Sequence, residues 1–181
     1  NIVTRHSGDT HGAEIVVAGG NDGLADVRAR VGWGNDAASF RLSTGRRADH
    51  GYRNAFDDMV LRQTHFRADL RPSVSDDMLV EAGGTEFSGG EGFLADPGNS
   101  QRTVFWNDWY LHGQWRRQLS DTDEIKVSAN VDQERIHDST PYAPLPAVLL
   151  DFGGEGRRYN VEIQHQLGLT QSLRAVWEGE R

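Results

Sequence analysis

The sequence contains no cysteine and a single lysine, and each scarcity narrows what the chain can be. Without cysteine the chain has neither a disulfide framework nor a thiolate metal site. Because Lys126 is the only lysine, arginine carries almost all of the positive charge, and the net charge is -8 over 181 residues. Such an acidic chain lacks the basic face that nucleic-acid binding needs, so we expect no nucleic-acid partner.

Long apolar runs are also missing from the sequence. No stretch approaches the ~20 consecutive apolar residues that a membrane-spanning helix needs, and the mean hydropathy is -0.63. The spacing of an amphipathic helix is missing as well. These absences exclude a helical membrane protein, but they do not exclude a protein that crosses a membrane with strands.

What the sequence does contain is a two-residue alternation of apolar and polar side chains. Segment 24–45 shows it best, with two alternating arms joined by the turn residues Gly34-Asn35-Asp36. In its first arm the apolar positions are Val27, Ala29, Val31 and Trp33. The same pattern predicts strands over 13–19, 24–33, 38–45, 60–71, 77–87, 104–119, 125–132, 159–167 and from 173 onward.

We therefore predict an all-β fold, an antiparallel up-and-down meander of about nine strands. The connections alternate in length: those on one side are short, and three on the other are long, over 46–58, 88–102 and 137–156. Short turns on one side and long loops on the other are typical of outer-membrane β-barrels. Burying the charged face in a dry core would be energetically costly, whereas the water-filled lumen of a barrel would leave these charges hydrated. Trp33 and Trp115, near short turns, would then belong to an interfacial aromatic girdle.

Two other all-β classes bear on this interpretation. A soluble ligand-binding module, for example a carbohydrate-binding sandwich, stays open; its apolar stripe would face a second sheet. A small eight-stranded barrel with lipase-like activity would need a closing strand and a Ser-His arrangement, and neither is apparent. The seven histidines are scattered, and the Gly-rich stretches lack the strand-then-helix setting of a phosphate loop. We expect no enzyme, no bound metal and no cofactor.

Several segments resemble the TonB-dependent receptors, the gated barrels of the bacterial outer membrane. The segments are NIVTR (1–5), AEIVVAGG (13–20), FRADLRPSVSDDMLVEAG (66–83) and GQWRRQLSDTDEIKVSANVDQE (113–134). The resemblance implies that residues 1–11 are the end of the plug domain and its linker. It implies that residues 12–181 are the first part of a partial transmembrane β-barrel, about nine strands of 22.

The resemblance also implies a function and its partners. The function would be active uptake of a scarce nutrient, most plausibly a ferric siderophore or another iron complex. The partners would be outer-membrane lipid, the transported small molecule or metal chelate, and TonB, which the missing N-terminal plug region would contact. There is no initiating Met or signal segment, and the chain ends in EGER within a predicted strand. We therefore expect a fragment.

Aromatic and arginine side chains on the long loops and beside them are the candidate substrate contacts. Aromatic rings offer stacking surface, and arginine offers charge-assisted hydrogen bonds to anionic groups such as siderophore carboxylates. The candidates are Tyr52, Arg53, Phe56, Phe93, Phe105, Trp106 and Tyr142.

Overall fold

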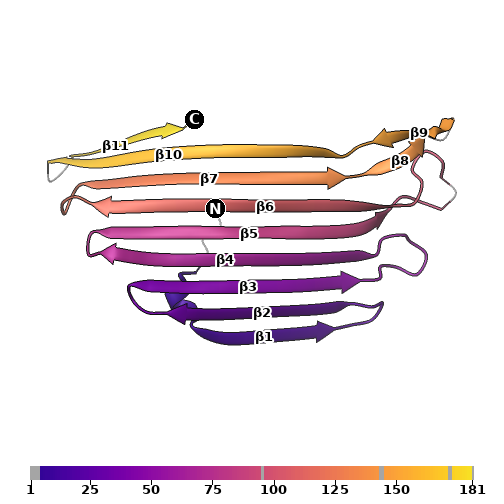
Figure 1. Cartoon of the computed structure of the whole chain (residues 1–181), viewed down its shortest axis with the longest axis horizontal. Coiled ribbons are helices and arrows are strands. Elements are labelled where there is room, and N and C mark those ends of the chain that lie inside the picture. The colour runs from indigo at the N-terminus through magenta and orange to yellow at the C-terminus, as the bar shows by residue number, and fades with distance from the viewer. Residues whose placement is uncertain (1–4, 95, 143–144, 171–172, 181) are drawn as a thin grey trace.

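The chain folds as one broad antiparallel sheet. The computed structural model describes residues 5–94, 96–142, 145–170 and 173–180. Its main sheet has nine strands in the order β1-β2-β3-β4-β5-β6-β7-β10-β11, so each strand pairs with the next along the chain except where the hairpin β8-β9 intervenes (Figure 1). The predicted all-β meander is confirmed.

The strands begin near the predicted positions, and several extend further. The strands of the main sheet are β1 (Gly12–Gly19), β2 (Ala25–Gly34), β3 (Ala38–Asp49), β4 (Met59–Ser73), β5 (Asp76–Glu91), β6 (Arg102–Gln118), β7 (Glu124–His137), β10 (Gly154–Thr170) and β11 (Leu173–Glu180). Strand β5 continues through Gly90, which we had predicted to lie in a loop, because the Gly90 amide donates to the Asp58 carbonyl (2.8 Å). A Cβ at Gly90 would lie 2.7 Å from the Phe56 carbonyl oxygen, so glycine permits this approach.

Short turns gather at one end of the sheet and are held by their own side chains. At the β2–β3 turn, Asn35 Oδ1 accepts from the amides of Ala37 and Ala38. At the β4–β5 turn, Ser73 Oγ donates to Asp76 Oδ2 (2.6 Å). Such local side-chain bonds fix tight turns, as polar turn residues predict.

The opposite end carries the long loops, apart from the tight β1–β2 turn (Figure 1). That turn is closed by the Leu24 amide, which donates to the Asn21 carbonyl. Its two central residues, Asp22 and Gly23, have φ of 56° and 74°, the conformation of a type I′ hairpin turn. The prediction for 137–156 was wrong in part, because a second hairpin, β8 (Ser139–Tyr142) and β9 (Leu145–Asp151), forms inside this loop.

The sheet is a single layer over the described residues. Among them only three apolar side chains are buried, Ala48, Ala68 and Val104, whereas Val27 and Ile163 are 45% and 53% exposed. A sandwich would bury such residues against a second sheet. None of the described segments supplies one, so the apolar face is uncovered.

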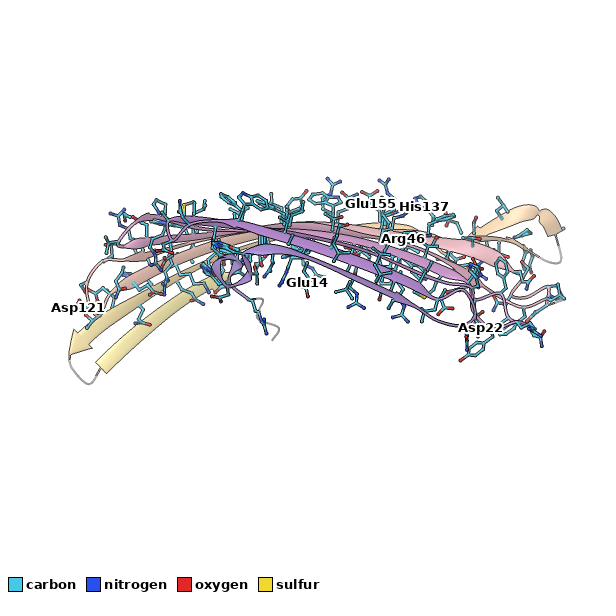
Figure 2. All side chains as sticks on the ribbon, turned by 90° about the horizontal axis from the view of Figure 1, so that it is seen from below. Glu14, Asp22, Arg46, Asp121, His137 and Glu155 are labelled. Atoms are coloured by element: carbon cyan, nitrogen blue, oxygen red, sulfur yellow. The ribbon has the colours of Figure 1, made fainter. Side chains whose placement is uncertain are left out.

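The sheet is also bowed, and its two sides are distinguishable (Figure 2). Glu14 lies on the concave side, whereas His137 and Glu155 lie on the convex side. Residues 6–10, predicted as a polar linker, include a single 3₁₀ turn, η1 (Ser7–Thr10), and none of the described residues is in an α-helix. Residues 1–5, which the resemblance assigns to the end of the plug domain, lie outside the described residues except for Arg5, which is not in a strand.

Candidate functional site

The convex face carries an uncharged band. Residues that pair directly across neighbouring strands form cross-strand rows, and three consecutive rows of this face contain no charged side chain. The rows are Val31-Leu42-Phe66-Ala82-Leu111-Val131-Tyr159, Trp33-Phe40-Ala68-Val80-Gly113-Ala129-Val161 and Ala38-Leu70-Met78-Trp115-Val127-Ile163. We call these residues the apolar band.

Aromatic rings occur in all three rows of the apolar band. The Trp33 and Phe40 rings stack with centroids 5.6 Å apart, and Phe40 stacks on Phe66 at 6.4 Å. In the row nearest the short turns, Trp115 donates its indole N–H to Asp76 Oδ1 (2.9 Å). An apolar ring with a polar handle suits a boundary between apolar and wet surroundings.

The concave face carries the interleaved charged rows. Arg30 and Glu14 are 2.7 Å apart, and Arg67 bridges Asp69 (2.7 Å) and Glu81 (3.1 Å). These pairs run between neighbours on one strand or across adjacent strands, where opposite charges stabilise a sheet. These charges are therefore balanced locally.

The turn η1 is fastened to the concave face by a buried polar cluster. Ser7 is fully buried; its amide and its hydroxyl both donate to Asp69 Oδ2, at 2.8 and 2.5 Å. Ser7 Oγ also lies 2.6 Å from Ser39 Oγ, and Arg41 donates to the Arg5 carbonyl (2.9 Å). Since Arg67 binds both oxygens of Asp69, the acceptor is held in place for the turn. We call these contacts the N-terminal anchor.

A glycine on β2 makes room for the anchor. A Cβ at Gly32 would lie only 2.1 Å from the Thr10 carbonyl oxygen, closer than any real contact. The alternation of β2 placed Gly32 on the charged face, but it gave no reason for a glycine there. The structure supplies that reason, because the η1 backbone crosses β2 at this point.

Beside the anchor, the concave face opens into a hollow of about 860 Å³. Its wall is strongly charged and mixed in sign, with His6, Asp69, Arg71, Asp77, Arg116 and Lys126 among its residues. Asp77 binds Arg71 (3.0 Å) and Arg116. Such a surface suits a polar partner or water rather than an apolar ligand.

All seven predicted substrate contacts lie at the long-loop end of the sheet. Tyr52, Arg53 and Phe56 occupy the β3–β4 loop, Phe93 lies in the β5–β6 loop and Tyr142 ends β8. Tyr52 and Phe93 are the most exposed of the aromatic residues whose side chains the structure describes, at 79% and 67%.

Phe105 and Trp106 do not share a surface. They are successive residues of β6; Phe105 pairs with Ser88 and His137 in a convex row, whereas Trp106 pairs with Phe87 and Ile136 in a concave row. Strand alternation alone predicts this separation, because successive residues of a strand point to opposite faces. Trp106 therefore lies on the side of the hollow, and Phe105 on the side of the apolar band.

Arg102, which sequence reasoning missed, ties two long loops together. Its guanidinium binds both carboxylate oxygens of Asp138, between β7 and β8, and donates to Asn99 Oδ1 (2.6 Å). Ser100 and Thr140 reinforce the link through hydroxyls 2.7 Å apart. The Arg102 hydrogen bonds hold the pKa of Asp138 below its usual value. No local sequence pattern pairs Arg102 with Asp138, which are 36 residues apart.

Neither membrane helices nor metal clusters occur in the part of the chain that the structure describes. No helix there is long and apolar enough to span a membrane. Nor do three or more His, Asp or Glu side chains gather there to form a metal site. No family model matches this chain, and no curated protein or solved structure does either.

Proposed function

We propose that this chain is part of the wall of a TonB-dependent outer-membrane receptor that takes up a scarce nutrient, an iron complex above all. One observation carries the proposal: a single-layer bowed sheet with an uncharged apolar band across its convex face and charged rows on its concave face. A barrel wall has this arrangement, with lipid outside and water inside. In a sandwich, the apolar face would instead be buried against a second sheet.

The register makes the separation of the two faces sharp. Asn130 and Val131 are neighbours on β7, yet they belong to a charged concave row and to the apolar band, respectively. Three uncharged rows in succession are costly for a face in water, because they leave apolar side chains such as Leu111, Val161 and Ile163 exposed side by side, and large contiguous apolar patches are rare on soluble monomers. Hydrocarbon removes that cost.

The ends of the strands agree with the same orientation. Short turns would lie on the periplasmic side and long loops outside the cell, as in known outer-membrane barrels. Trp33, Phe40 and Trp115 would then lie at the periplasmic interface. The loop residues Tyr52, Arg53, Phe56, Phe93 and Tyr142, with Trp106 on the upper lumen wall, would meet the substrate first.

The N-terminal anchor supports a plug that enters the lumen. Ser7 is fixed to Asp69 and Ser39 on the concave face, so a plug joined to the chain before it would enter on that side. The charged hollow beside the anchor offers polar contacts to such a segment. A plug held by hydrogen bonds and ion pairs can be displaced by TonB without exposing an apolar interface to water.

The proposal is tested with matched pairs of single cysteines, which the cysteine-free sequence permits without background. The pairs are Val131→Cys with Asn130→Cys and Val161→Cys with Asn160→Cys, each labelled with a fluorophore after reconstitution into lipid. We expect brominated lipid tails to quench the labels at 131 and 161, and aqueous iodide to quench those at 130 and 160. Equal access of iodide to both members of each pair would contradict a lipid-facing band.

A further inference from the structure

The apolar band ends abruptly in arginine on the long-loop side. The next two rows of the convex face are Thr44-Thr64-Gly84-Trp109-Gln133-Arg157 and Arg46-Arg62-Glu86-Asn107-Arg135-Glu155. They hold four arginines and two glutamates in a chain whose overall charge is -8. We call Arg46, Arg62, Arg135 and Arg157 the arginine rim.

The other edge of the band has no such excess. There the next row holds Asp76 and Arg117, which face each other across β5 and β6 at 3.9 Å. The two edges of one apolar band thus differ in charge, and the positive one lies beside the long loops. Charge that served only to keep the chain soluble would not be expected to differ between the two edges, so the excess of arginine at one edge needs another explanation.

The rim side chains remain available to a ligand. Arg46 is exposed and has no ion pair within the described parts of the chain. Arg62 is 62% exposed, although it contacts Glu86 at 3.3 Å. Arg135 and Arg157 share Glu155, at 2.6 and 3.5 Å, so one carboxylate serves two guanidinium groups.

The geometry points to a binding surface for the phosphate groups of anionic lipid heads along the arginine rim. The inference rests on the proposed function, because it needs the apolar band to lie in hydrocarbon. On β3 the uncharged stretch of the convex face runs over 38–44 before Arg46. That is shorter than the ~9–11 residues of a strand that crosses a bilayer. Long arginine side chains bridge this difference, because their stems lie along apolar surface while their heads reach the phosphates.

Two Arg-Arg dipeptides provide a matched test. Arg46 and Arg157 belong to the rim, while Arg47 and Arg158 follow them in sequence and lie on the concave face. All four are exposed. The variants Arg46→Gln/Arg157→Gln and Arg47→Gln/Arg158→Gln therefore change the same charge on the same strands, on opposite faces.

Binding of the whole chain is measured by flotation with vesicles of phosphatidylcholine, with and without phosphatidylglycerol. The chain should prefer the anionic vesicles, and the rim variant should lose that preference by about five-fold for each arginine removed. The concave variant should keep it. Equal losses in the two variants would overturn the inference and indicate a net-charge effect.

A gain-of-binding variant guards against loss through misfolding. Glu155→Gln frees Arg135 and Arg157 from their shared carboxylate, so the preference for anionic vesicles should increase several-fold. An unchanged or weaker preference overturns the inference. If the unmodified chain binds both kinds of vesicle equally, the inference fails while the proposed function stands. If it binds neither, both fail.

Discussion

The two faces of this sheet consist of alternating residues of the same strands, yet the concave face carries charged side chains and the convex face carries the apolar band. On the concave side many charges are paired with a neighbour, as Arg67 is with Asp69 and Glu81. On the convex side the apolar band contains no charge to pair. The comparison teaches that the surroundings of the sheet, rather than an internal core, determine which residue type each face accepts.

The comparison depends on register. A slip of one residue would exchange the faces of a whole strand, placing arginines such as Arg41 and Arg67 in the apolar band. Several devices fix the register: the type I′ turn at Asp22-Gly23, the Asn35 turn and the Trp33–Phe40 ring pair. Local turn chemistry is thus what keeps the two faces apart.

The sharpest way to break the comparison is to put one charge in the middle of the apolar band. Val131→Arg should lower the free energy of unfolding in lipid by about 2–4 kcal/mol, because in the proposed orientation the charge would enter hydrocarbon. Asn130→Arg, one residue earlier and on the concave face, should cost far less. Urea titration of both variants in vesicles measures the difference, and equal costs would argue against hydrocarbon at position 131.

A steric change tests the concave face alone. Gly32→Ala would push a Cβ against the Thr10 carbonyl oxygen, so η1 must move or β2 must bend. Overpacking of this kind costs about 1–3 kcal/mol. Protease cleavage near residues 6–10 should increase. The control is Gly113→Ala in the apolar band, where a new Cβ has nothing within 4 Å; similar cleavage in both variants would refute the anchor.

Acidification tests the tie between the long loops, which belongs to neither face. Because the pKa of Asp138 is lowered in the folded chain, the Arg102–Asp138 link is fully formed above the ordinary carboxyl pKa of ~3.9. It is lost as the pH falls through the lowered value. Hydrogen bonds to charged groups contribute about 1.5 kcal/mol here.

The NMR resonance of Arg102 Nε reports the loss of the link. Its shift should titrate below pH 4 in the unmodified chain. In Asp138→Asn the shift should be constant over that range and already near the acid value. A titration that persists unchanged in Asp138→Asn would show that another group controls the loop.

Sequence alternation was enough to predict the strands, the two faces and the asymmetry of the connections, since each follows from period and turn residues over short distances. The hairpin β8–β9 was not predicted, because Pro141 and its neighbouring prolines are typical of loops. The N-terminal anchor was not predicted either, for a different reason. Ser7 and Asp69 are 62 residues apart, and nothing local to either residue selects the other.

The smallest expected loss of stability comes from removing the ring contacts within the apolar band. Phe40→Leu keeps the residue apolar but removes both ring contacts, with Trp33 and with Phe66. Aromatic pairs contribute about 0.5–1.5 kcal/mol beyond the area that they bury. Phe105→Leu is the control, because Phe105 also lies on the convex face and has no ring contact among the described residues. If urea titration in lipid gives both variants the same loss, the three rings act only as apolar surface, and the register must be held by the turns.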